Sequence, residues 1–509
     1  MTPNKKEYLI WVLIPLLSFL SISSQGIWID EAIRIACASV TIENGFFDQQ
    51  WALMQMGLAN IMYIWEVIFG RSEFASRCMN IPFLMIAAVY LVRILRHYKL
   101  SAFWVLLLCV HPMISYYLND AGPYLALLAC SCGMYYHGFF TDKRGTWSNS
   151  LFLIGWFLLG YSIHFIFGFA GIVYLFSLIL WYRQIRSLKA MRREFIIAIL
   201  SAPFFLYITY MYLQYMQHGI DRGWETPGIL NIGVVIYSFL GLAGLGLPRN
   251  DMRSGDLQLI TPFMITAVSL NLLMLGIIVA AGFKRLVNYL KSPMVLSALA
   301  LAVGFYVAAA SRNFQFWERH LMFTFPAFFL ILVVLLQNAW NAARYRWLFR
   351  GAVIIYTGLL LFSSAQLRWN YDYQKEDIKG VYNYLNTHSI LHSNIPVLMQ
   401  GGNFLHYYYA CMDPRREVPT PARNIALVEA MPQSELIRLI EQTSPANPTI
   451  CLVLCRKTPA TLKLYQNAEQ FFSSLGYSVE ANNSFNGYKI LILRRKASPF
   501  SPFSPFAPF

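Results

Sequence analysis

The sequence is poor in charge. Of its 509 residues, 13% are charged, whereas 57% are hydrophobic and 16% are aromatic. A soluble chain has about twice this charged fraction. The formal net charge is +15, but the lysines and arginines lie in short loops between apolar runs, which is typical of membrane topology and not of a nucleic-acid-binding surface. The composition therefore predicts a polytopic membrane protein that binds no nucleic acid.

Several common motifs are also absent. The sequence has no Gly-rich phosphate loop with lysine and no G-x-G-x-x-G, so it does not favour a nucleotide site. Its eight cysteines are scattered and include no CxxC pair, so neither a disulfide framework nor a zinc site is favoured. No small-residue cleavage site follows the first apolar run, residues 8–20, which we therefore expect to be a retained span.

The basic loops predict the topology. If Lys5 and Lys6 are cytoplasmic, every strong basic loop lies on one side of the membrane when the chain crosses about eleven times. Residues 51–69 and 229–247 are also apolar, but a crossing at either would put the next basic loop on the wrong side, so both are predicted to be interfacial or re-entrant helices. The predicted spans are residues 8–20, 75–95, 101–118, 122–140, 150–165, 167–182, 195–215, 260–283, 293–311, 320–337 and 351–367.

Three regions follow from this reading. Residues 1–367 are predicted to form an α-helical transmembrane domain with two outer loops, 24–75 and 217–259. The second loop is rich in glycine, proline and charge, and it is interpreted as a lid or a substrate-ordered loop. Residues 368–497 resemble a soluble domain in composition and are predicted to lie outside the cytoplasm. Residues 498–509 repeat Pro-Phe, and proline at every third position predicts an extended, disordered tail.

The predicted soluble domain alternates short apolar runs with amphipathic segments, which is typical of an α/β fold. We expect strands at residues 397–399, 450–454 and 490–493, and helices at residues 375–387, 433–442 and 459–474. The fold class is thus a polytopic helical membrane protein with a small C-terminal α/β domain.

An acidic pair, Asp30 and Glu31, follows the first apolar run and is surrounded by apolar residues such as Trp28. Such surroundings disfavour ionisation, so a carboxylate there is expected to have a partner or a chemical task. Juxtamembrane acids are also often only solvated, or bound to an arginine at the interface. The sequence leaves both readings open.

Five short stretches of the sequence form a set of motifs: Trp28-Ile29-Asp30-Glu31, Gly70 to Arg77, Asn119 to Tyr124, Tyr161 to His164, and Glu318 to Leu321. In this order they resemble motifs of the glycosyltransferase C (GT-C) superfamily, in particular its branch of protein O-mannosyltransferases and aminoarabinose (ArnT-like) transferases. Two departures stand out: Gly122 replaces the arginine of the third motif, and His320 replaces the tyrosine of the fifth.

The resemblance implies a hexosyl- or pentosyltransferase of the bacterial inner membrane, which moves a sugar from a polyprenyl-phosphate donor to a glycan, lipid or protein acceptor on the extracytoplasmic face. Direct displacement needs a carboxylate to accept the proton of the acceptor hydroxyl. Asp30 is the first candidate and Glu31 its neighbour or alternate. Asp120, at the outer end of a span, is predicted to converge on the same cleft.

The leaving phosphate needs a fixed positive charge, and arginine suits it because its planar fork matches two phosphate oxygens. The candidates are Arg319, then Arg77, then Arg222, with Tyr124 and His320 as further substrate contacts. Arg319 also fits an interfacial anchor paired with Glu318.

A divalent metal is a further option, because His164 and Asp120 are both predicted near the outer ends of their spans and a cation there would neutralise the phosphate. The alternative for His164 is a hydrogen-bonded core residue.

Two rival functions remain. A transporter or flippase of lipid-linked sugars is expected to show two related halves, and the sequence has no internal repeat. A scaffold that binds a partner through its C-terminal domain would leave the acidic pair unused.

Overall fold

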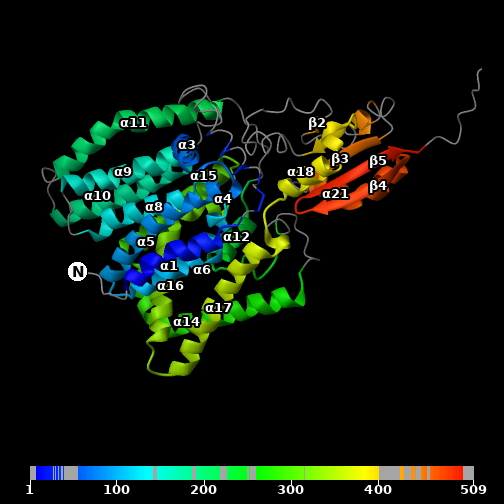
Figure 1. Cartoon of the computed structure of the whole chain (residues 1–509). Coiled ribbons are helices and arrows are strands. Elements are labelled where there is room, and N and C mark those ends of the chain that lie inside the picture. Colours follow the sequence, from blue (N-terminus) through cyan, green and yellow to red (C-terminus); the bar gives the residue numbers. More distant parts are fainter. Residues whose placement is uncertain are drawn as a thin grey trace, which may run out of the picture. The chain divides into compact units, whose positions relative to one another are not determined.

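A computed structural model describes most of the chain (Figure 1). Contacts divide it into two compact units. The helical unit is Met1–Ser24, Ile33–Arg249 and Leu257–Tyr373, and the α/β unit is Gln25–Ala32, Asn250–Asp256 and Gln374–Phe509. The described residues are 7–23, 25–26, 28, 30–31, 34–35, 38, 55–141, 146–185, 191–217, 226–248, 252, 260–314, 316–400, 425–428, 437–440, 442, 449–455 and 459–496.

The helical unit consists of α-helices joined by short 3-10 and π turns. Its elements in chain order are α1 (Tyr8–Ser21), α3 (Met56–Phe69), α4 (Glu73–Cys78), α5 (Asn80–His97), η3 (Ala102–Leu106), α6 (Leu107–Val110), α7 (Pro112–Leu118), α8 (Tyr124–Tyr135), η4 (Tyr136–Phe140), α9 (Trp147–Ile163), η5 (Phe165–Ala170), α10 (Gly171–Ile185), α11 (Arg192–Gln217), α12 (Ile229–Phe239), α14 (Pro262–Leu290), α15 (Pro293–Ser311), η8 (Glu318–Thr324), α16 (Phe325–Trp340), α17 (Arg346–Trp369) and η9 (Tyr371–Tyr373).

Seven helical segments within the described residues are long and apolar enough to cross a membrane, and each coincides with a predicted span. The other four predicted spans contain shorter or interrupted helices: α1, η3 to α7, α8 with η4, and α9. The number of crossings therefore stays a prediction. The seven segments are Glu73–His97, Phe165–Gln184, Arg192–Gln214, Pro262–Leu290, Pro293–Ser311, Glu318–Trp340 and Arg346–Trp369.

The two apolar segments that we excluded from the spans form α3, with 14 residues, and α12, with 11 residues. At a rise of about 1.5 Å per residue, neither helix reaches the thickness of a hydrocarbon core of about 30 Å. Since α1 also has only 14 residues, length alone does not separate spans from interfacial helices here, and the interfacial assignment stays a prediction.

The predicted span 101–118 is wrong as a single helix, because the chain breaks at Pro112. His111 takes an extended backbone (φ −77°, ψ 124°) and Pro112 starts α7. Proline disfavours the helical region for the residue before it and cannot donate a backbone hydrogen bond. His111 is fully buried, and its Nε2 lies 3.0 Å from the carbonyl oxygen of Phe239.

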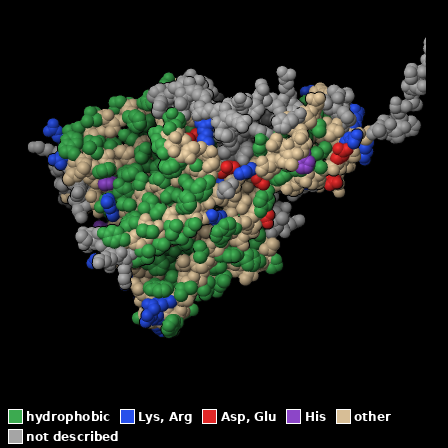
Figure 2. Space-filling view, viewed as in Figure 1, with side chains coloured by type: hydrophobic (Ala, Val, Ile, Leu, Met, Phe, Trp, Pro, Cys, Tyr) green, Lys and Arg blue, Asp and Glu red, His purple; other side chains and the backbone are tan. Residues whose placement is uncertain are grey.

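Helix α8 is the core of the helical unit. All of its residues are buried, and it packs against α5, α9 and η8 (Figure 1). In contrast, α11, α14 and α17 expose large apolar side chains, such as Leu200 at 74%. Figure 2 shows hydrophobic side chains over wide areas of this unit. Apolar surface of this extent fits helices that face lipid.

The α/β unit contains a five-stranded sheet of order β2-β1-β3-β5-β4. β1 pairs in parallel with β2 and β3, whereas β5 pairs antiparallel with β3 and β4. The strands are β1 (Val397–Gln400), β2 (Ile425–Val428), β3 (Thr449–Cys455), β4 (Tyr477–Phe485) and β5 (Tyr488–Arg495), and the helices include α18 (Ile378–Thr387) and α21 (Pro459–Ser474).

The three predicted strands are confirmed as β1, β3 and β5, and the predicted helices at 375–387 and 459–474 are confirmed as α18 and α21. Of the predicted helix 433–442, residues 437–440 and 442 are helical and the rest lie outside the described residues. The tail at 498–509 also lies outside them.

The prediction missed β2 and β4. β4 is an edge strand in which exposed polar residues, such as Asn482, alternate with partly buried residues. A two-residue turn, Asn486-Gly487, connects it to β5, and Gly487 has the positive φ (+78°) that such hairpin turns require.

Candidate functional site

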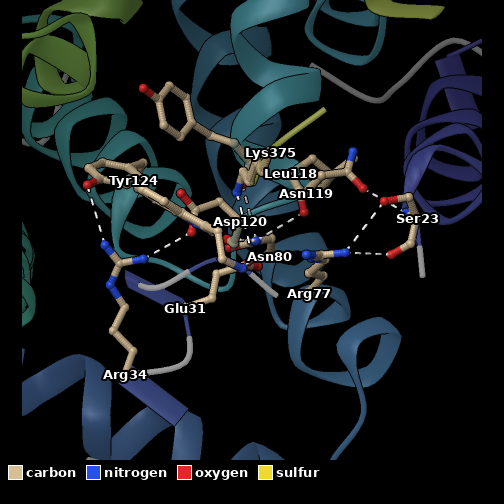
Figure 3. Close-up of polar contacts among 12 residues, drawn as sticks. Ser23, Glu31, Arg34, Arg77, Asn80, Leu118, Asn119, Asp120, Tyr124 and Lys375 are labelled. Carbon is tan, nitrogen blue, oxygen red and sulfur yellow. Dashed lines mark hydrogen bonds and ion pairs between the residues drawn. The ribbon is translucent and has the colours of Figure 1, made fainter. Parts of the chain in front are cut away.

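Asp120 and Arg34 form a buried ion pair within the helical unit. Arg34 Nη1 lies 3.0 Å from Asp120 Oδ1, and Arg34 Nε donates to Gln55 Oε1 at 3.1 Å. Arg34 Nη2 lies 3.5 Å from the hydroxyl of Tyr124, and Figure 3 shows the guanidinium pointing toward Asp120 and Tyr124. Asp120 is fully buried and Arg34 is 8% exposed. Charge-assisted contacts on several sides hold this guanidinium in one orientation.

The loop between α7 and α8 is held rigidly, so Asp120 is well positioned. Asn80 Nδ2 donates to the carbonyl oxygen of Asp120 at 2.7 Å. Asn119 Nδ2 donates to the carbonyl oxygen of Ser21 at 3.0 Å, and Asn119 Oδ1 accepts from the amide of Ser23 at 2.7 Å. The end of α1 and the start of α5 therefore fix this loop.

Gly122 leaves the space that the Arg34 side chain uses. A Cβ atom at residue 122 would stand 2.7 Å from Arg34 Nη1 and 2.8 Å from Asp120 Oδ1. The guanidinium that the third motif lacks at residue 122 is thus supplied next to it by Arg34. We did not single out Arg34 from the sequence, although the missing arginine and a basic residue shortly after the acidic pair were both visible.

Tyr117 connects Tyr124 with the fifth motif. The rings of Tyr117 and Tyr124 are 4.6 Å apart, and the Tyr117 hydroxyl donates to Glu318 Oε1 at 2.7 Å. Glu318 is buried, with 3% of its surface exposed. The next residue, Arg319, contacts His320: Arg319 Nε lies 3.3 Å from His320 Nε2. The alternative reading of Arg319, an interfacial anchor paired with Glu318, stays a prediction.

His164 lies in the turn between α9 and η5, outside both helices. Its Nδ1 accepts a hydrogen bond from the amide of Ile166 at 3.2 Å and so caps η5. The His164 ring is buried, and the positive charges of Arg34 and Arg319 both act on it. Since both arginines act on this ring, His164 shares their surroundings. Of the predicted residues, the structure brings Asp120, Tyr124, His164, Arg319 and His320 into one region.

Arg77 and Arg222 differ from the other candidates. Arg77 is 1% exposed, and its Nη1 donates to the carbonyl oxygen of Ser23 at 3.0 Å (Figure 3). This contact ties α4 to the end of α1 and gives Arg77 a structural task, and its contact with a phosphate stays a prediction. Arg222 lies outside the described residues.

The acidic pair belongs to the α/β unit. Glu31 is fully buried, and its Oε2 accepts a hydrogen bond from the amide of Trp28 at 3.1 Å. Asp30 is half-buried, and both residues have helical backbone. Because Asp120 and Arg319 belong to the other unit, the predicted convergence of all four residues on one cleft stays a prediction.

A divalent metal held by His164 and Asp120 would need further ligands. Among the residues that the structure describes, no group of three or more His, Cys, Asp or Glu side chains lies close enough to hold a metal ion. The Nδ1 atom of His164 accepts from a backbone amide, and Oδ1 of Asp120 faces Arg34. A divalent metal held by His164 and Asp120 stays a prediction.

No protein-family model and no curated protein sequence matches the chain. Solved structures do. ArnT from Cupriavidus metallidurans bound to undecaprenyl phosphate superimposes with a TM-score of 0.55 at 12% identity, over 96% of this chain and 98% of that chain. The apo structure of the same protein gives a TM-score of 0.50 at 11% identity, over 95% and 98%.

A cryo-EM structure of the arabinofuranosyltransferase AftD from Mycobacteria gives a TM-score of 0.48 at 12% identity, over 98% of this chain and 40% of that chain. The ArnT structures, in contrast, match along almost the whole length of both chains. The chain therefore has the fold of ArnT, and the predicted resemblance to the GT-C superfamily is confirmed at the level of the fold.

Proposed function

We propose that this protein is a membrane glycosyltransferase that moves a sugar from a polyprenyl phosphate to an acceptor on the extracytoplasmic face. The observation that carries this proposal is the buried Arg34–Asp120 pair, which presents a fixed guanidinium in a fold shared with a protein that binds undecaprenyl phosphate. A fixed guanidinium is suited to the charge that develops on a leaving phosphate.

The proposed reaction is a single displacement. The acceptor hydroxyl attacks the anomeric carbon, the bond from that carbon to the phosphate oxygen breaks, and the electron pair leaves with the lipid phosphate. Asp30 takes the proton of the hydroxyl, because it is half-buried and therefore reachable, whereas the Glu31 carboxylate is fully enclosed. One displacement inverts the configuration of the sugar.

Arg34 and Arg319 bind the phosphate in this proposal. When the sugar leaves, the phosphodiester of the donor becomes a phosphate monoester and gains a negative charge. The two guanidinium groups compensate this charge. Asp120 then acts as a positioning residue, because its carboxylate already binds Arg34 at 3.0 Å. This assigns Asp120 a task other than proton transfer.

The test uses the full-length protein in detergent or nanodiscs. Undecaprenyl phosphates carrying a labelled pentose or hexose are incubated with the protein and an envelope fraction, and the label is followed into glycans, lipids and proteins. Binding of undecaprenyl phosphate is measured in parallel. The variants are Asp30→Asn and Arg34→Ala, and Glu480→Gln, an exposed carboxylate of the α/β unit, is the control.

We expect transfer by the wild type and the control, a loss of about 10²–10⁴-fold in Asp30→Asn with normal lipid binding, and weaker lipid binding in Arg34→Ala. Full transfer by Asp30→Asn would remove the proposed base. A wild-type protein that binds undecaprenyl phosphate and moves it across the bilayer without transferring any sugar would instead favour a flippase.

A further inference from the structure

The acidic segment is built into the α/β unit and not into the membrane helices. Residues 25–32 cluster by their contacts with the chain after Gln374, although they follow the first apolar helix in the sequence. A Cβ atom at Gly26 would stand 2.7 Å from Lys379 Cβ, so the two backbones pack closely. The segment that contains Asp30 and Glu31 therefore depends on the C-terminal part of the chain for its position.

One side chain makes this connection directly. Lys375 Nζ lies 3.9 Å from Glu31 Oε2 (Figure 3) and 5.1 Å from the centre of the Trp28 ring. The side chain of Lys375 is 6% exposed and that of Glu31 is fully buried. An ammonium group at this distance from an indole face also makes a favourable cation–π contact. Lys375 thus contacts two of the four residues of the first motif.

The backbone around Lys375 is held from the sheet. Asn486, in the turn between β4 and β5, donates from Nδ2 to the carbonyl oxygen of Gln374 at 2.7 Å. Its own carbonyl oxygen accepts from the amide of Asp377 at 2.9 Å. Two hydrogen bonds to one turn residue therefore fix the segment on either side of Lys375. The turn between β4 and β5 thus fixes the backbone of residues 374–377, which carries Lys375.

A buried carboxylate needs a compensating charge, because its removal from water is costly. Lys375 supplies a cation to Glu31, and the Trp28 amide supplies a hydrogen bond. Together they fix Glu31, whose neighbour in the sequence, Asp30, is the proposed base. The geometry points to Lys375 as a positioning residue: it holds Glu31 in place, so that the α/β unit orients the acidic motif for sugar transfer. The link to catalysis rests on the proposed function.

The test compares Lys375→Met, which keeps the length of the side chain without its charge, with Lys375→Arg, which keeps the charge. Lys489→Met is the matched control, because Lys489 is a half-buried lysine of the same unit with an acidic neighbour, Glu469. Hydrogen exchange of the peptide covering residues 25–32 is measured on the full-length protein, together with kcat and KM for a labelled undecaprenyl-phosphate sugar.

In Lys375→Met we expect the amide of Trp28 to exchange at least about tenfold faster, kcat to fall about 10- to 100-fold and KM to change little, since a displaced base affects the transition state more than binding. In Lys375→Arg, the slow exchange of the Trp28 amide and the value of kcat should both be close to those of the wild type. Lys489→Met should resemble the wild type in both measurements. Unchanged exchange at Trp28 in Lys375→Met would overturn the inference, whether or not the protein transfers sugar.

Faster exchange in a protein whose wild type transfers no sugar would support the positioning contact and reject the proposed function, so the two failures are distinguishable. If Lys375→Met folds poorly, the thermal stability of the double variant Glu31→Gln/Lys375→Met tests the contact between Lys375 and Glu31. Removing both partners leaves no buried charge alone, so thermal stability should recover relative to the single variant. Additive losses in the double variant would contradict the contact.

Discussion

The guanidinium of Arg34 and the carboxylate of Asp120 stand 3.0 Å apart, in contact with the space that a side chain at residue 122 would occupy. The pair connects the chain just after the acidic motif with the loop between α7 and α8. The Arg34–Asp120 pair occupies the space beside Gly122 and lies at the centre of the candidate site in the helical unit.

Replacing Arg34 by alanine should abolish most of the activity. The variant leaves the Asp120 carboxylate without a buried cation and the phosphate without a fixed donor, and we expect kcat for sugar transfer to fall about 10²–10³-fold. Arg34→Lys should recover only part of it, since a lysine cannot contact Asp120, Gln55 and Tyr124 in the planar arrangement of a guanidinium. Steady-state kinetics with a labelled undecaprenyl-phosphate sugar checks this.

A reciprocal exchange tests the relation between residues 34 and 122. Gly122→Arg alone should lower activity at least about tenfold, because its Cβ would stand 2.7 Å from Arg34 Nη1 and two guanidinium groups would compete for one carboxylate. In the Arg34→Ala background the same substitution should recover part of the lost activity, because the new guanidinium can bind Asp120 once the Arg34 side chain is gone, although the Asp120 carboxylate, 2.8 Å from the Cβ position, has to shift.

The control for this exchange is Gly155→Arg, also in the Arg34→Ala background, because nothing lies within 4 Å of a Cβ at that glycine. It should not restore activity. A double variant Arg34→Ala/Gly122→Arg that is no better than Arg34→Ala would show that Arg34 acts by a route other than the space at Gly122.

Sequence reasoning identified those parts of the fold that depend on local pattern. The seven long spans follow from unbroken hydropathy, and β1, β3 and β5 from continuous apolar runs. The break at Pro112 was missed because the apolar run continues through it, although the proline itself was visible. β4 was missed because an edge strand with one exposed face carries little apolar signal.

Short sequence motifs predicted part of the candidate site. Asp120, Tyr124, His164 and Arg319 were named from short strings, and the structure places them in one region. Arg34 and Lys375 were not named, because each acquires its task through a partner distant in the sequence, Asp120 for Arg34 and Glu31 for Lys375. No periodicity or spacing reports such a contact in a single sequence.

Loss of the Tyr117 hydroxyl should destabilise the region between α7 and η8. Tyr117→Phe keeps the ring contact with Tyr124 but removes the donor to the buried Glu318 carboxylate, which should cost about 1–3 kcal/mol of unfolding free energy. Thermal unfolding of the purified protein measures the loss. Tyr210→Phe is the control, since it removes the hydroxyl of an exposed tyrosine of the helical unit. Equal stability of Tyr117→Phe and the wild type would contradict this role.

Substitutions at His164 distinguish a capping role from a role as a metal ligand. Its Nδ1 accepts from the amide of Ile166 at the start of η5, and asparagine can accept the same hydrogen bond, so His164→Asn should retain most of the stability and activity, whereas His164→Leu should lose about 1–2 kcal/mol of stability. A divalent metal held by His164 and Asp120 would give another pattern: both variants would lose bound metal by elemental analysis, and both would lose sugar transfer. Because the cap uses one ring nitrogen and the described residues supply too few further ligands, we expect the first pattern, in which the asparagine variant stays active and its metal content equals that of the wild type.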